Sequence, residues 1–217
     1  MDLDQNEQKV WSFVQRDYQV ESELGQGSFA KVVKAKCKLT GKHVAIKLID
    51  NIFEGRTSLK NTLRELQIMH ELSKMDGNTF TVKMLDVILP VKRKSDLQNF
   101  DFLFIVMNYV QRDLNALLGH INPKNFSEGH SLQILYNSLC CINYLETANV
   151  IHRDLKPNNF LVNDKCGVVI CDFGYARTLP IDPKESYYTR KTELGTISLS
   201  SSCQGEDQST LTRHSRF

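Results

Sequence analysis

The segment VIHRDLKPNNFLVNDKCGVVICDFGYAR, residues 150–177, most constrains what this chain can fold into. Two short apolar runs, FLVN and GVVICD, predict a pair of strands. Polar loops flank the pair, and they carry the carboxylates of Asp154 and Asp172 and the amide of Asn159. We expect these groups to hold a metal, a phosphate chain and a hydroxyl nucleophile in one place.

Each polar residue in this segment suits one step of a phosphoryl transfer. Asp154 can orient an attacking hydroxyl or accept its proton, and Lys156 places a positive charge beside the transferred group. Asn159 can bind a hard cation through its amide oxygen, and Asp172 can offer a carboxylate to Mg²⁺ that bridges two phosphates. An Asp or Asn near a turn is usually a cap, but the ordered set HRDxKxxN followed by DFG favours chemistry.

A glycine-rich stretch, GQGSFA, lies between two predicted strands near the start of the chain. Gly25 and Gly27 would let backbone N–H groups approach a phosphate chain closely. Ala30 stands where the pattern GxGxxG has its third glycine. A tight hairpin without a ligand is the alternative for so short a pattern.

Lys47, in the stretch VAIK, and Glu65 form a predicted ion pair. Lys47 lies on a predicted strand and Glu65 on the helix predicted after it. A lysine in a strand can be an exposed edge charge, but a buried lysine needs a counter-ion. A Lys–Glu pair can hold the ammonium against phosphate oxygens.

The rest of the chain reads as a β-rich part followed by a helical part. Apolar spacing at residues 58–72 predicts a helix with Ser58 as its N-cap, and the spacing at 130–148 predicts another. A short helix begins near residue 113. In residues 1–16, four apolar side chains either fold back onto a core or mark a missing partner: Val10, Trp11, Phe13 and Val14. The predicted strands cover residues 17–24, 31–39, 42–50, 80–89 and 100–108.

Composition excludes several classes of protein. With 27 basic and 25 acidic residues, the charge of +2 gives no case for binding nucleic acid or a membrane. The longest apolar run, 102–107, is too short to span a bilayer and predicts a buried strand. The polar N-terminus is not a signal peptide. Six cysteines without a CxxC pair predict reduced, mostly buried thiols and a cytoplasmic or nuclear location: Cys37, Cys140, Cys141, Cys166, Cys171 and Cys203.

With GxGxxA, VAIK, HRDLKPNN and DFG in this order, residues 17–180 resemble a eukaryotic protein kinase. HRDLKP is typical of the Ser/Thr branch, and the segments TLREL, YVQRDLNALL and ICDFGYAR resemble the MAP kinases of the CMGC group. The resemblance implies an α+β, bilobal kinase-like fold. It divides the chain into an extension (1–16), a complete β-rich N-lobe with the ATP-binding loop (17–109), a partial helical C-lobe with the catalytic loop (110–180) and an irregular, disordered tail (181–217).

The resemblance also implies ATP and Mg²⁺ as cofactors and a protein substrate. Asp154, Lys156, Lys47 and Glu65 match catalytic positions, and Asn159 and Asp172 match the metal ligands. Tyr109 belongs to the hinge, whose backbone would bind adenine. The positions that match nucleotide contacts are the glycine-rich loop (Leu24, Gly25, Gln26, Gly27, Ser28), the residues above and below adenine (Val32, Ala45, Leu161), the gatekeeper Met107, the hinge residues Asn108 and Val110, Asp113 near the ribose, and Lys47.

Three arginines, Arg64, Arg153 and Arg177, match positions that in MAP kinases gather around a phosphothreonine. An arginine cluster is favourable when an anion fills it, so the resemblance implies activation by an upstream kinase. Scattered, solvated arginines are the alternative. The candidate phosphoacceptors are Tyr187, Tyr188, Thr189, Thr192, Thr196 and Ser198.

The sequence departs from MAP kinases after residue 180. No Thr-x-Tyr switch, APE motif or further helices follow, so we expect a kinase cut short after the start of its activation segment. The apolar face of the 130–148 helix, through Leu132, Leu135, Leu139, Ile142 and Leu145, would then lack its partner. Two functions stay open, a Ser/Thr kinase and a catalytically impaired module that binds nucleotide or a partner. A chain that does not fold stably is a third possibility.

Overall fold

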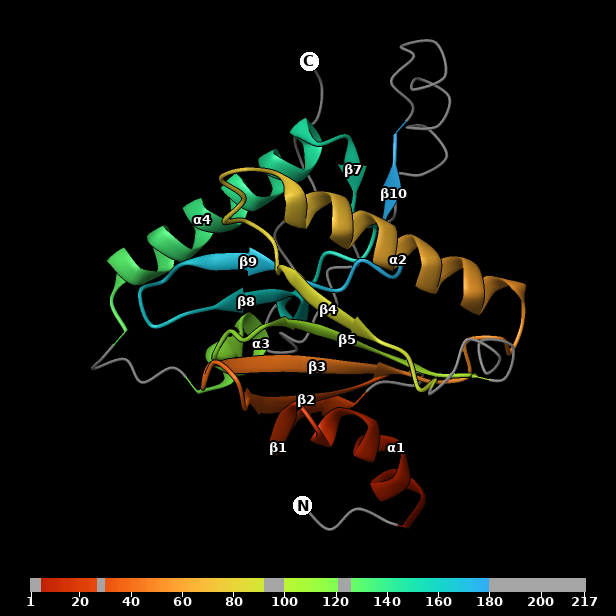
Figure 1. Cartoon of the computed structure of the whole chain (residues 1–217). Helices are drawn as coiled ribbons and strands as arrows, with labels where there is room; N and C mark the ends of the chain where they lie inside the picture. The colour runs from red at the N-terminus through yellow and green to blue at the C-terminus, as the bar shows by residue number, and fades with distance from the viewer. Residues whose placement is uncertain (1–4, 27–29, 92–99, 121–125, 180–217) are drawn as a thin grey trace, which may run out of the picture.

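The computed structural model describes residues 5–26, 30–91, 100–120 and 126–179. A five-stranded antiparallel sheet, in the order β1-β2-β3-β5-β4, forms the first part (Figure 1). A smaller, mainly helical part follows, with the three-stranded sheet β6-β8-β9 and the pair β10-β7. The five-stranded sheet consists of β1 (Tyr18–Gln26), β2 (Ala30–Cys37), β3 (His43–Ile49), β4 (Met84–Ile88) and β5 (Leu103–Asn108).

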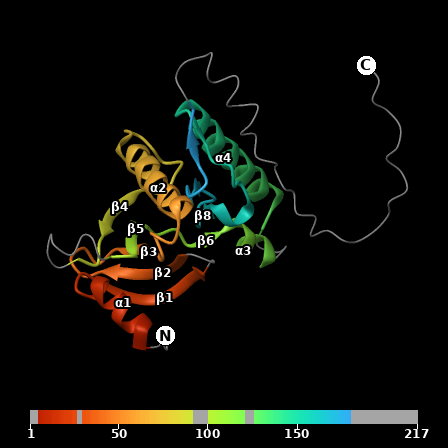
Figure 2. The same cartoon turned by 90° about the vertical axis from the view of Figure 1, so that its right-hand side faces the viewer.

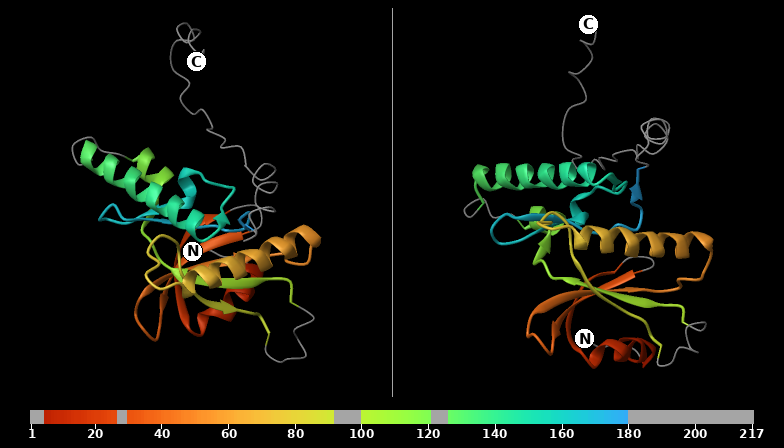
Figure 3. Two further views of the ribbon diagram at one scale, coloured as in Figure 1. Left: turned by 90° about the horizontal axis from the view of Figure 1, so that it is seen from above. Right: turned by 45° about the horizontal axis from the view of Figure 1, so that its top comes forward.

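Helix α1 (Gln5–Gln15) lies on one face of this sheet, and α2 (Arg56–Lys74) and α4 (Glu128–Thr147) lie on the other side in both views (Figures 1 and 2). Figure 3 shows the resulting order of layers: α1, sheet, α2, α4. The shorter elements are β6 (Arg112–Asp113), α3 (Leu114–Gly119), β7 (Val150–Ile151), the 3-10 turn Pro157–Asn159, β8 (Phe160–Val162), β9 (Val168–Ile170) and β10 (Arg177–Thr178).

Strand β5 is buried on both faces, as its unbroken apolar run predicts. Phe104 and Val106 belong to the core beneath α1, and Leu103, Ile105 and Met107 belong to the core shared with α2 and α4. Because successive side chains of a strand point to opposite faces, one six-residue strand serves two cores. The predicted buried strand is confirmed.

The N-terminal extension folds back as helix α1. Trp11 and Val14 are fully buried, and the Trp11 ring lies 5.3 Å from that of Phe104 between centroids. Residues three apart share one face of a helix, so this spacing gives α1 an apolar side that covers β5. Of the two alternatives for these residues, the structure shows packing onto the core.

Helix α2 begins earlier than predicted, and Ser58 is not its N-cap. The cap position is Gly55, with φ of 110° and no side-chain cap. Ser58 lies inside the first turn, where its hydroxyl donates to the carbonyl of Asn51 at 3.3 Å. The prediction was wrong because the preceding loop turns on a glycine that permits positive φ.

Helix α4 buries one side and exposes the other. Ser127 caps its N-terminus, and its hydroxyl accepts from the N–H of His130. On the exposed side, Leu132, Leu135 and Leu139 are 59%, 57% and 56% exposed, so none of the described elements buries this face. The prediction that Leu145 belongs to this face was wrong. Leu145 lies in the core and is 3% exposed.

The five cysteines in the described part of the chain are all free thiols. Of these, Cys141 is buried and the other four are partly exposed, so the prediction of mostly buried thiols was wrong. Cys203 lies outside the described residues. No helix in the described ranges is long and apolar enough to cross a membrane.

Candidate active site

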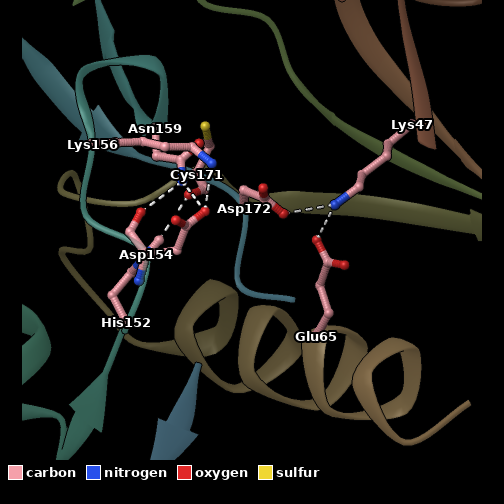
Figure 4. Close-up of polar contacts among 8 residues, drawn as sticks. All are labelled: Lys47, Glu65, His152, Asp154, Lys156, Asn159, Cys171 and Asp172. Carbon is pink, nitrogen blue, oxygen red and sulfur yellow. Dashed lines mark hydrogen bonds and ion pairs between the residues drawn. The ribbon is translucent and has the colours of Figure 1, made fainter. Parts of the chain in front are cut away.

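Lys47 links the two parts of the molecule through its ion pair with Asp172 (Figure 4). Its ammonium lies 2.6 Å from Glu65 Oε1, on α2, and 3.0 Å from Asp172 Oδ1, which follows β9. The side chains of Lys47 and Glu65 are 11% and 5% exposed, whereas that of Asp172 is 40% exposed. The predicted ion pair is confirmed, and Asp172 is a second carboxylate at the same ammonium.

Mutual charge fixes the protonation of this group. Burial alone would lower the pKa of Lys47, but the carboxylates of Glu65 and Asp172 outweigh it and raise that pKa. Burial would likewise raise the pKa of Asp172, yet the charge and hydrogen bond of Lys47 lower it. Burial raises the pKa of Glu65. A charged lysine beside a charged Asp172 can therefore receive phosphate oxygens and a metal.

The loop between β7 and β8 brings Asp154, Lys156 and Asn159 together. Lys156 Nζ lies 2.7 Å from Asp154 Oδ2. The amide of Asn159 donates to the carbonyl oxygen of Asp154 at 2.8 Å and to its Oδ2 at 3.0 Å. Lys156 and Asn159 thus hold the Asp154 carboxylate from two sides. The hydrogen bond to Asp154 raises the pKa of Lys156.

His152 supports the loop from below (Figure 4). Its buried ring makes a 2.9 Å contact from Nε2 to the carbonyl oxygen of Cys171, and its Nδ1 accepts from the N–H of Asp154 at 3.3 Å. This pairing requires the neutral tautomer with its proton on Nε2. Burial accordingly lowers the pKa of His152. The motif HRD contains this histidine, but sequence reasoning gave it no task.

The backbone is unusual at two residues of the site. Arg153 has φ of 66° and Asp172 has φ of 65°. Non-glycine residues rarely adopt this left-handed region, where they are often found at functional positions. The backbone holds both the catalytic-type loop and the DFG turn in these conformations.

The oxygens present fit a magnesium ion. The Nδ2 of Asn159 makes both hydrogen bonds to Asp154, so its Oδ1 is the atom that can bind a cation. The Oδ1 of Asp172 accepts the hydrogen bond from Lys47, so its Oδ2 is the atom that can bind a cation. One or two protein oxygens, completed by substrate phosphates and water, are the usual set for Mg²⁺. The described residues hold no cluster of three or more His, Cys, Asp or Glu side chains suited to a metal.

The residues predicted to contact adenine belong to, or pack against, one core cluster that includes residues of both parts of the molecule. Ala45 pairs with Met107 across β3 and β5, and both are buried. Val32 and Leu161 are partly buried and pack against the same core. All four residues are apolar, as most of the lining of a site for a flat ring is.

The structure describes most of the other residues that were predicted to contact the nucleotide. Asp113 pairs with Leu161 through β6 and β8, and its carboxylate accepts from the N–H of Ala116 at 2.8 Å as the cap of α3. Leu24, Gly25 and Gln26 end β1, and Asn108 and Val110 lie where β5 leads towards β6. Gly27 and Ser28 lie outside the described residues.

Two of the three predicted arginines share one hollow. Arg64 and Arg177 line a hollow of about 280 Å³ with Lys60. Arg153 is not among the residues that line it, and its Nε donates to the carbonyl oxygen of Tyr175 at 2.7 Å. Lys60, one helical turn before Arg64, was missed, although the i, i+4 spacing of two basic residues was visible in the sequence. The candidate phosphoacceptors lie outside the described residues.

Residues 18–198 match the protein kinase domain family, so the chain belongs to the protein kinases. Among its relatives, mitogen-activated protein kinase mpkA of Aspergillus fumigatus is 36% identical over 173 residues, which are 80% of this chain and 38% of that protein. Mitogen-activated protein kinase spm1 of Schizosaccharomyces pombe is 35% identical over 176 residues (80% and 39%). Mitogen-activated protein kinase 7 of Arabidopsis thaliana is 37% identical over 155 residues (71% and 39%). The chain thus spans about two-fifths of the length of the curated relatives it matches.

Proposed function

We propose that this chain transfers the γ-phosphate of Mg²⁺-bound ATP to serine or threonine hydroxyls of proteins, as a MAP-kinase-like enzyme. The observation that carries the proposal is the buried ammonium of Lys47 between Glu65 and Asp172. It places a fixed positive charge from the sheet next to the carboxylate best suited to a metal. A nucleotide phosphate chain fits between two such groups.

Each residue has one task in the transfer. Lys47 binds phosphate oxygens, and Asn159 and Asp172 would hold Mg²⁺, which supplies positive charge to the phosphates. Asp154 orients the incoming hydroxyl and takes its proton as the oxygen bonds to phosphorus and the bond to ADP breaks. Lys156, 2.7 Å from Asp154, stabilises the charge that develops on the transferred group.

We further propose that an upstream kinase activates the enzyme. The supporting observation is the basic hollow of Lys60, Arg64 and Arg177, which lies between α2 and the strand that follows the DFG turn. A phosphate bound there would join these two segments by charge-assisted hydrogen bonds.

The test is transfer of labelled γ-phosphate from ATP to a generic basic Ser/Thr protein substrate. We expect the parent chain to label the substrate, and Asp154→Ala and Asp172→Ala each to lower the rate by at least about 10²-fold. Asp76→Ala, an exposed carboxylate in a turn after α2, is the matched control and should keep full activity. Equal labelling by the parent and both site variants would refute the proposed reaction.

A second candidate is a chain that binds nucleotide without turnover. An apolar groove of about 380 Å³ runs under the catalytic loop, lined by Leu135, Leu155 and Pro157 among others. The exposed face of α4 continues from it, so the loop has little support on this side. A misplacement of about 1 Å can lower a rate about a hundredfold. Binding of a fluorescent ATP analogue together with no transfer above Asp154→Ala would favour this function.

A further inference from the structure

Asn108, the last residue of β5, makes two hydrogen bonds with Lys83, the residue directly before β4. Its backbone N–H donates to the carbonyl oxygen of Lys83 at 3.2 Å. The N–H of Lys83 donates to the side-chain oxygen Oδ1 of Asn108 at 2.6 Å. The second bond is the shorter one, and it depends on the identity of the side chain.

This pattern differs from a regular antiparallel ladder. Met84 pairs with Met107, so Lys83 and Asn108 occupy the next position in register. Two residues in a hydrogen-bonded pair normally exchange both backbone N–H···O bonds. Here the side-chain amide oxygen of Asn108 stands in for its own backbone carbonyl, and the carbonyl is released from the ladder.

The neighbouring hinge side chains also contact other elements. The Tyr109 ring lies 5.3 Å from Lys34 Nζ and 6.2 Å, between centroids, from the ring of His43. Gln111 Nε2 donates to Asp164 Oδ2, in the turn after β8, at 3.2 Å. Side chains thus fix this segment to other elements, and the Tyr109 hydroxyl also donates to the carbonyl oxygen of Gln111 at 3.4 Å.

We propose that Asn108 is a positioning residue: its side chain releases the hinge carbonyl from β4 so that this carbonyl accepts from the 6-amino group of adenine. The inference rests on the proposed function, because it requires a nucleotide in the site. Adenine presents a donor at this position. Hypoxanthine, the base of ITP, presents an acceptor there, so the released carbonyl selects ATP over ITP.

The experiment compares Asn108→Leu, which has no acceptor, with Asn108→Asp, which keeps an oxygen at the same distance from the backbone. Affinities for Mg²⁺-ATP and Mg²⁺-ITP are measured by calorimetry with each chain. We expect Asn108→Leu to lower the ATP-to-ITP affinity ratio about fivefold, the equivalent of one hydrogen bond. Asn108→Asp should stay within about twofold of the parent, since an Asp oxygen accepts the same bond.

Hydrogen exchange without nucleotide gives a second readout. The Lys83 amide should be protected in the parent and in Asn108→Asp and should exchange faster in Asn108→Leu. An unchanged exchange rate of the Lys83 amide in Asn108→Leu overturns the inference. A loss of affinity for ATP and ITP by the same factor also overturns it, because a general loss of stability would produce that result. If the parent binds neither nucleotide, the proposed function fails and this inference fails with it, whereas binding with an unaltered ratio refutes the inference alone.

Discussion

The buried Lys47 gives a prediction whose size depends on which partner is removed. Lys47→Met takes away the ammonium and leaves the Glu65 carboxylate at 5% exposure, with Asp172 as a second negative charge nearby. Removal of one partner from a buried ion pair costs about 3–5 kcal/mol. We expect Lys47→Met to lower the free energy of unfolding by an amount in this range.

Glu65→Leu should be less damaging. The Lys47 ammonium would keep Asp172 at 3.0 Å, and that carboxylate is 40% exposed and well hydrated. We expect a loss of about 1–3 kcal/mol, because the remaining charge has a partner. The double variant Lys47→Met/Glu65→Leu replaces the buried pair by apolar side chains, a change that is often nearly neutral. It should therefore be more stable than Lys47→Met alone.

Urea unfolding measures all four chains, followed by circular dichroism and by the fluorescence of Trp11. The chain has one tryptophan, and it lies buried on the far face of the sheet from Lys47, so it reports unfolding without touching the mutated site. The deficit of Lys47→Met should shrink as the pH falls from 7 towards 5. Burial raises the pKa of Glu65. Without Lys47, the Glu65 carboxylate therefore binds a proton more readily in the folded state than in the unfolded chain, so a lower pH favours the folded state.

Equal losses in the two single variants would refute this reasoning, because Lys47 would then not depend on two carboxylates. Strict additivity in the double variant would be equally damaging, since it would mean that Lys47 and Glu65 do not interact in solution.

Two further predictions concern buried rings. Burial lowers the pKa of His152 in the folded protein. Near pH 6.5 the unfolded chain therefore binds a proton at this residue while the folded chain does not. The melting temperature should fall as the pH drops through this value. His152→Gln should flatten that dependence in melts from pH 8 to 5.5, and an unchanged slope would contradict it. Trp11→Ala should lower the free energy of unfolding by about 3–5 kcal/mol in urea titrations followed by circular dichroism. Ser12→Ala, exposed on the same helix, should change it by less than about 0.5 kcal/mol, and similar losses in both would show that α1 does not pack in solution.

The sequence predicted the parts of the site that local pattern determines. Lys47 and Glu65 sit on a strand and a helix whose periodicities are clear, so their pairing follows from packing one element on the other. Ala45 and Met107, predicted to contact adenine, lie on strands whose apolar runs are equally clear. Their roles in binding and catalysis remain predictions.

Other features depend on contacts that no local pattern specifies. The second partner of Lys47, Asp172, comes from a turn 125 positions away. The bond between Asn108 and Lys83 requires the register of β4 on β5, which shifts between Met84 and Asp86. The error at Ser58 has a similar origin, because a loop glycine decided where α2 begins.

Helix α1 has a practical consequence for anyone who designs an expression clone. The match to the kinase family begins at residue 18, after α1 has ended. A clone cut at that family boundary would discard Trp11 and Val14 and expose the outer apolar side of the sheet, which includes Phe104 and Val106. Such a surface invites aggregation. Because those side chains share β5 with Met107, which is predicted to contact the nucleotide, a failed preparation of this kind would wrongly suggest that the kinase part itself cannot fold.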